Sequence, residues 1–126
     1  MNQHGKQIMS AIILILEGEH TCEVKEQALC ILGNIADGDT AKEYIMSNED
    51  ILKKLTSYML NSNVNLQTAA TFCINNLILI DEEGASIRQE RLKELSVPKI
   101  LQQLLSTPHS TLFDRVKTAL QQFNSK

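Results

Sequence analysis

The sequence predicts an all-α fold, a right-handed helical solenoid of about three repeats in which the first repeat lacks its first helix. Segments 23–36 and 65–78 carry the same pattern of apolar residues, forty-two residues apart. A fainter third copy at 112–123 follows the second by forty-six residues. Helical units of this length bury their apolar faces only against neighbouring units, so we expect one domain over 1–126. Its repeats are expected at about 1–38, 39–80 and 81–126.

The copies agree at the positions that should face the core. The matched apolar pairs of the first two copies are Val24 with Leu66, Ala28 with Ala70, Leu32 with Ile74, and Ile35 with Leu77. The third copy places Leu112, Val116, Leu120 and Phe123 at these positions. Asn34 also matches Asn76, and Gln122 stands at that position in the third copy. A polar position therefore recurs beside the apolar face of each third helix.

The apolar segment 8–16 predicts the second helix of the first repeat, because a shift of forty-two residues places it on 50–58. The segment is too short to span a bilayer and lacks a signal-peptide cleavage pattern after it, so we expect no membrane partner. One face of this helix would be covered by a preceding repeat and has no partner in this sequence. We expect that face to be exposed and to support self-association through Ile8, Ile12, Ile15 and Leu16.

Capping residues and breakers place the remaining helices. In the middle repeat we expect helices at about 40–46, 50–60 and 64–79, with Ser47 and Asp50 forming a capping box for the second. In the last repeat the first helix is expected at about 86–95. The second should begin with Pro98 at its first position and end at Thr107 and Pro108. Thr111 and Asp114 should cap the third.

Composition and charge exclude several functions. The net charge is −3 and the pI about 5.6, so no extended basic surface is available and we expect no nucleic-acid partner. The three cysteines are odd in number, which favours reduced thiols and a cytoplasmic and nuclear protein. No Gly-rich phosphate loop, metal-ligand cluster or nucleophile with a base can be assembled, so we expect no cofactor, metal or enzymatic activity.

The block 23–39, EVKEQALCILGNIADGD, resembles the armadillo third-helix consensus, of the type EVQEEALWALSNLAAGD, at more than half its positions. The segments ILEGEH, TAKEYIM, FCINNLI and TALQQ are similar, more narrowly, to the C-terminal repeats of armadillo scaffold subunits in C-terminal-to-LisH (muskelin-type) ubiquitin ligases. This resemblance implies a non-catalytic subunit that holds the substrate-receptor subunit against LisH-type core proteins. The catalytic RING-type subunits would lie elsewhere in the assembly.

The resemblance also implies a binding groove lined by the third helices, in which an asparagine near each helix end holds the backbone of an extended ligand. A carboxamide suits this role because it offers a donor and an acceptor together. Asn34, Asn76 and Gln122 would form this ladder. Residues four and eight positions earlier share the same helical face. They are Glu26 and Cys30, Thr68 and Phe72, and Asp114 and Thr118. Glu26, Asp37 and Asp114 would make the groove mildly acidic and favour a partner segment with some positive charge.

Other interpretations remain open. Asn34 could simply brace a helix end, and Phe72 could belong to the core. The chain could also be a general armadillo adaptor or a transport receptor for an extended peptide of another partner. The tryptophan that peptide-carrying armadillo proteins place four residues before the asparagine is replaced here by Cys30, Phe72 and Thr118. Its absence argues against recognition of basic localisation peptides.

Overall fold

The computed structural model describes residues 3–35, 39–78 and 84–124, and these form eight α-helices. The helices are α1 (Gln3–Glu17), α2 (Cys22–Ile35), α3 (Asp39–Ser47), α4 (Glu49–Met59), α5 (Val64–Leu77), α6 (Ala85–Glu94), α7 (Val97–Leu104) and α8 (Ser110–Asn124). The all-α prediction is confirmed. In the described part of the chain most helix boundaries agree with the expected ones to within two residues, but α1 begins at Gln3, before the predicted segment 8–16, and α7 ends at Leu104, before the predicted Thr107. Leu79, where α5 was expected to end, lies outside the described residues.

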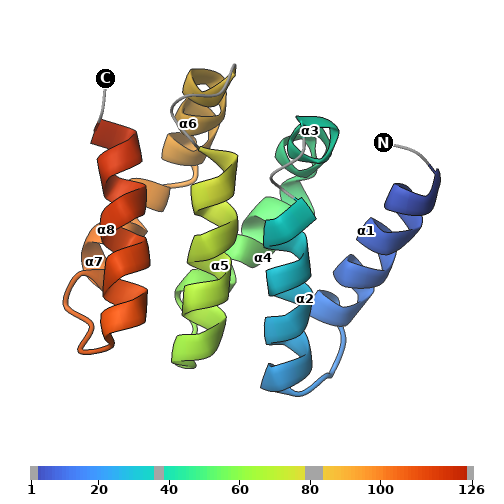
Figure 1. Cartoon of the computed structure of the whole chain (residues 1–126), viewed down its shortest axis with the longest axis horizontal. Helices are drawn as coiled ribbons and strands as arrows, with labels where there is room; N and C mark the ends of the chain where they lie inside the picture. Colours follow the sequence, from blue (N-terminus) through green and yellow to red (C-terminus); the bar gives the residue numbers. More distant parts are fainter. Residues whose placement is uncertain (1–2, 36–38, 79–83, 125–126) are drawn as a thin grey trace.

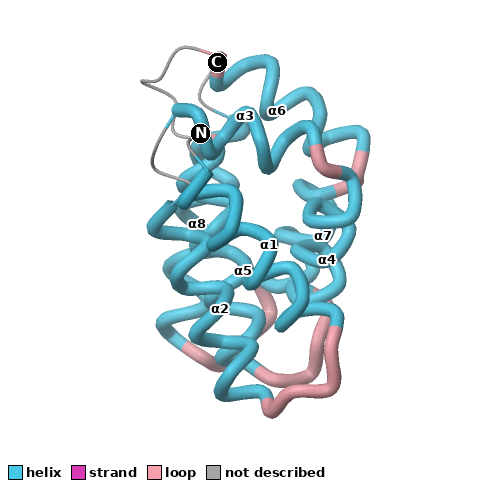
Figure 2. Tube along the Cα trace, turned by 90° about the vertical axis from the view of Figure 1, so that its right-hand side faces the viewer, coloured by secondary structure: helices cyan, strands magenta, loops and turns pink. Residues whose placement is uncertain are grey.

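The helices repeat one arrangement along the molecule. Helices α2, α5 and α8 lie side by side in one layer, with α5 in the middle (Figure 1). Helices α4 and α7 pack behind α5 and α8, α1 packs against α2, and α3 and α6 lie together at one end (Figures 1 and 2). The order α3–α4–α5 is therefore repeated as α6–α7–α8, and α1–α2 supplies the second and third helices of the first unit. This is the architecture of an armadillo-type solenoid.

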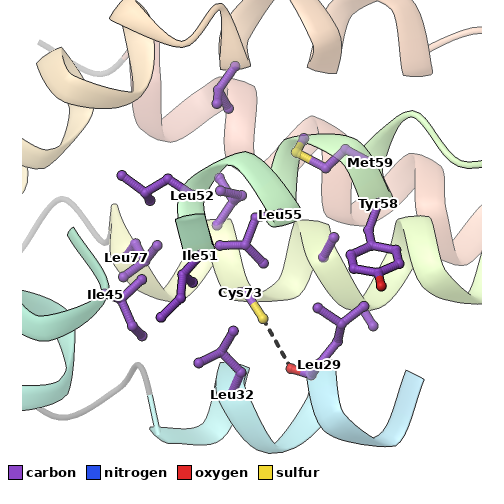
Figure 3. Close-up of a cluster of buried hydrophobic side chains, with 14 of the residues drawn as sticks. Leu29, Leu32, Ile45, Ile51, Leu52, Leu55, Tyr58, Met59, Cys73 and Leu77 are labelled. Atoms are coloured by element: carbon purple, nitrogen blue, oxygen red, sulfur yellow. Dashed lines mark hydrogen bonds between the residues drawn. The ribbon is translucent and has the colours of Figure 1, made fainter. Parts of the chain in front are cut away.

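One apolar core runs through all the repeats. Figure 3 shows a cluster of its buried side chains, which includes Leu29 and Leu32 of α2, Leu55 of α4 and Leu77 of α5. Each of these four side chains is fully buried. Third helices that share a continuous core with second helices cannot slide past one another without opening cavities, because interiors are close-packed. The layer of α2, α5 and α8 is therefore held as one surface.

The predicted exposed face of the first helix is wrong. Ile12 and Leu16 are only 3% and 2% exposed, and Ile8 and Ile15 are partly buried. The reason is that α1 turns this face inward, against α2 and α4, and the Tyr58 hydroxyl of α4 donates a hydrogen bond of 2.7 Å to the Leu16 carbonyl oxygen. Among the described residues of α1, the large apolar side chain that is exposed is instead Leu14, at 68%. These residues therefore stabilise the fold and do not form a free self-association face.

Two predicted caps also differ from the structure. The side chain of Asn48, and not of Ser47, accepts the Ile51 N–H at 3.1 Å and caps α4, while the Ser47 hydroxyl donates to the Tyr44 carbonyl oxygen. Similarly, α8 begins at Ser110, so Thr111 lies inside its first turn. An asparagine side chain competes well with serine for a cap, because both reach the free N–H groups of the first turn.

Helix α7 begins one residue before the predicted position. Its first residue is Val97, which makes Pro98 the second helical residue. Either position tolerates proline, because the first-turn N–H groups have no partner within the helix.

In the described part of the chain, no helix combines the length and the apolarity needed to cross a membrane.

Candidate functional site: a hollow across the third helices

A hollow of about 590 Å³ crosses the surface formed by α2, α5 and the beginning of α8. It lies on the layer of third helices that Figure 1 shows in front. Its lining residues are Glu26, Cys30 and Asn34 of α2, Val64, Asn65, Thr68, Ala69 and Phe72 of α5, and His109, Ser110, Thr111, Leu112 and Arg115 at α8. Since all three repeats contribute, the stacking of the repeats is what creates the site.

Phe72 of α5 lines the hollow and is partly buried. On one side its ring packs against the backbone of α2, because a Cβ atom added at Gly33 would meet the Phe72 Cδ2 atom at 2.5 Å. On the other side the Arg115 guanidinium of α8 lies 4.9 Å from the ring centroid, a cation–π contact. The ring therefore joins all three third helices while remaining partly open to the hollow.

The two matched asparagines have different surroundings. Asn34 is exposed on the hollow, and its carboxamide makes no hydrogen bond with any residue that the structure describes. Asn76 is partly buried, and its Nδ2 donates to the Gly33 carbonyl oxygen at 2.7 Å. The neighbouring Asn75 uses its Nδ2 to donate to the Arg115 carbonyl oxygen at 3.2 Å. The carboxamide of Asn34 is therefore open to a ligand, whereas the donors of Asn75 and Asn76 hold neighbouring third helices together.

The pKa of the Cys30 thiol is affected by two charged side chains of the hollow. Partial burial raises its pKa, the Glu26 carboxylate raises it further, and the Arg115 guanidinium lowers it. A raised pKa keeps the thiol protonated and a poor nucleophile at neutral pH. Cys73 is buried, its Sγ donates to the Leu29 carbonyl oxygen at 3.1 Å (Figure 3), and burial also raises its pKa. All three cysteines are free, and neither Cys30 nor Cys73 has the character of a catalytic thiol.

The structure brings together half of the predicted groove residues. Glu26, Cys30, Asn34, Thr68 and Phe72 line the hollow. Asp114 and Thr118 are exposed on α8 outside it, where the Thr118 hydroxyl donates to the Asp114 carbonyl oxygen. Asn76 and the partly buried Gln122 also lie outside the lining, and Asp37 lies outside the described residues.

Arg115 and His109 line the hollow but were not predicted from the sequence. Arg115 is three residues before Thr118 and seven before Gln122, spacings that also share a helical face. The positions four and eight before Gln122 are Thr118 and Asp114, so a rule based on these spacings does not select Arg115. His109 immediately precedes α8, and it lines the hollow because the beginning of α8 lies beside α5. This contact joins segments distant in the chain, so the spacing within one helix does not predict it. Among the described residues, no group of three or more His, Cys, Asp or Glu side chains could hold a metal ion.

Comparisons with known proteins agree with the repeat architecture. No family model matches the chain. Armadillo repeat-containing protein 8 from Pongo abelii, Danio rerio and Mus musculus is in each case 58% identical over 123 residues, or 98% of this chain. The chain spans only 18% of the length of these relatives.

Solved structures share the fold at low sequence identity. A designed armadillo repeat protein, in complex with the peptide (KR)4, superposes with a TM-score of 0.76 at 21% identity, over 94% of this chain and 51% of its own. A second engineered protein reaches a TM-score of 0.55 at 16% identity, over 97% of this chain and 64% of its own. At these identities the likeness establishes the fold and not the ligand.

Proposed function

Because this chain is an armadillo-repeat region, 58% identical over nearly its whole length to part of armadillo repeat-containing protein 8, we propose that its hollow holds an extended segment of a protein partner. The main observation is that residues at matched positions of α2 and α5 line one hollow, together with the carboxamide of Asn34, which makes no hydrogen bond with a described residue. This carboxamide can pair with both the N–H and the C=O of one peptide unit. Phe72 offers a partly open ring for an apolar or aromatic side chain of the same segment.

The role that fits this surface is a non-catalytic scaffold. Armadillo-repeat proteins typically bind other proteins and do not catalyse reactions. In the hollow, the raised pKa of Cys30 lowers the fraction of thiolate, which is the nucleophilic form. The residues of the hollow are therefore suited to recognition by hydrogen bonds, apolar contact and charge.

The partner that we propose is the substrate-receptor subunit of a C-terminal-to-LisH type ubiquitin ligase. The support is the sequence similarity to armadillo repeat-containing protein 8, together with the resemblance of the third-helix motifs to scaffold subunits of such ligases. In this role the chain would hold the receptor near LisH-type core proteins and so promote ubiquitin-dependent degradation, in the cytoplasm and the nucleus. The free cysteines suit such reducing compartments.

A binding titration tests the groove. The receptor subunit is titrated into the wild-type chain and into Asn34→Ala, with Gln102→Ala as control because Gln102 is an exposed carboxamide on α7, away from the hollow. We expect Asn34→Ala to weaken binding by about 1–3 kcal/mol and the control to bind as wild type. Equal affinities of folded Asn34→Ala and wild type would place the contact surface elsewhere.

Two further measurements test the ligase assignment. Affinity purification of the tagged chain from cells, followed by mass spectrometry, should recover LisH-type and RING-type subunits. Recovery of transport factors or other armadillo ligands instead would favour the general adaptor function. The purified chain, mixed with an activating and a conjugating enzyme, should transfer no ubiquitin above background, and stimulated transfer would contradict the scaffold function.

A further inference from the structure

We propose that the hollow selects partner segments that carry an acidic side chain, Asp or Glu, which the Arg115 guanidinium binds. This inference rests on the proposed function and specifies the chemistry of its ligand. It replaces the expectation of a positively charged partner. That expectation depended on Glu26, Asp37 and Asp114, of which Asp37 lies outside the described residues and Glu26 alone lines the hollow.

Arg115 is held in place by its neighbours on α5. Its carbonyl oxygen accepts a hydrogen bond of 3.2 Å from Asn75, and its guanidinium lies 4.9 Å from the Phe72 ring centroid. The guanidinium N–H groups of Arg115 make no hydrogen bond with any described residue, so they are available to acceptors of a ligand. A carboxylate can accept two of these N–H groups at once, and such charge-assisted pairs are the strong ones.

The described residues provide no carboxylate partner for Arg115. By contrast, Arg91 pairs with Glu49 at 2.9 Å and with Glu94 at 3.1 Å. The structural difference is that Arg91 has acidic neighbours within reach on α4 and α6, whereas Arg115 faces the hollow. In the described part of the chain, the Arg115 guanidinium contacts the Phe72 ring and lowers the pKa of the Cys30 thiol, and it forms no ion pair with a carboxylate. A ligand carboxylate would therefore not have to displace an existing ion pair.

The hollow also contains the Glu26 carboxylate, and its position relative to Arg115 favours one orientation of the bound segment. Glu26 belongs to α2 and Arg115 to α8, and these helices lie on opposite sides of α5 (Figure 1). Glu26 raises and Arg115 lowers the pKa of the Cys30 thiol, since the two groups carry opposite charges. An acidic side chain is attracted at the α8 side and repelled at the α2 side, so only one placement of the segment is favoured.

The test uses a display library of random ten-residue peptides selected on the intact chain. We expect enriched peptides to share an Asp or Glu at one position, and their synthetic versions to lose about tenfold in affinity when that residue becomes Asn or Gln. Arg115→Gln should cause the same loss for the acidic peptide and no loss for its amide version. Lys117→Gln is the matched control, because it removes the same charge from an exposed site of α8 outside the hollow.

Two readouts separate this inference from the proposed function. Bound peptides should protect Cys30 from alkylation in a Cys22→Ser background, and Glu26→Gln should leave binding of the acidic peptide equal or tighter. Peptides that protect Cys30 without an acidic residue, or that bind Arg115→Gln as tightly as wild type, would overturn the inference and leave the groove function intact. If no enriched peptide protects Cys30, the groove function itself fails.

Discussion

Asn76 on α5 donates a hydrogen bond of 2.7 Å from its Nδ2 to the carbonyl oxygen of Gly33 on α2. The bond joins the C-terminal ends of two third helices from successive repeats. The carbonyl groups in the last turn of a helix lack partners within the helix, so a side chain from the next repeat satisfies one of them. The recurring asparagine is thus a brace between repeats at Asn76, while its match at Asn34 is open to the hollow.

The first prediction separates these two asparagines. Asn76→Ala should lower the free energy of unfolding by about 1–2 kcal/mol, because it leaves the Gly33 carbonyl oxygen without this donor. Asn34→Ala should change stability by no more than about 0.5 kcal/mol, since the exposed Asn34 makes no described hydrogen bond. Urea unfolding followed by circular dichroism measures both. Equal destabilisation by the two substitutions would show that the hydrogen bond from Asn76 to Gly33 does not add to the free energy of unfolding.

The second prediction concerns the close approach of α2 and Phe72. In a helix, Gly→Ala normally stabilises by about 1 kcal/mol, but a Cβ at Gly33 would lie 2.5 Å from the Phe72 Cδ2 atom. Gly33→Ala should therefore destabilise the chain by about 1–3 kcal/mol through overpacking. The double variant Gly33→Ala with Phe72→Ala should be more stable than Phe72→Ala alone, because the clash is gone and the helix-forming effect of alanine remains. Additive effects of the two substitutions would contradict this contact.

The third prediction compares matched positions of two repeats. Leu66 of α5 is 1% exposed and belongs to the apolar core, whereas its match Val24 on α2 is 39% exposed. Leu66→Ala should cost about 2–4 kcal/mol of unfolding free energy, and Val24→Ala about 0.5 kcal/mol or less. Thermal and urea unfolding provide the measurement. A large cost at Val24 would mean that this face is covered in solution, which sedimentation of the wild-type chain would then have to explain.

The fourth prediction uses the Cys30 thiol as a probe of charge. The thiolate is the reactive form, so alkylation at a fixed pH of about 8 speeds up when the Cys30 pKa falls. Glu26→Gln removes a charge that raises this pKa and should speed alkylation by about two- to fivefold. Arg115→Gln removes a charge that lowers the pKa and should slow alkylation by a similar factor. Measurement requires Cys22→Ser, because Cys22 is also exposed. If both variants speed alkylation, or both slow it, the opposite effects of Glu26 and Arg115 on Cys30 would be contradicted.

Part of the candidate site was accessible from the sequence because helical spacing is a local property. The spacing of four residues placed Glu26, Cys30 and Asn34 on one face of α2, and all three line the hollow. The same spacing on α8 selected Asp114 and Thr118, which lie outside the hollow. Spacing fixes which residues share a face, but the rotation of that helix against its neighbour decides which face meets the hollow. For α8 that rotation presents Arg115 to Phe72.

From the sequence alone, the repeat of apolar positions determined the helices, their order and the stacked architecture. That information is local, because a period near 3.6 residues defines a buried face and a recurrence near forty residues defines the repeat. Only the tertiary structure decided that Ile12 and Leu16 are core residues, that Asn76 binds Gly33, and that Arg115 faces the hollow without a carboxylate partner among the described residues. These properties depend on contacts between residues distant in the chain, so the pattern within a single helix does not contain them.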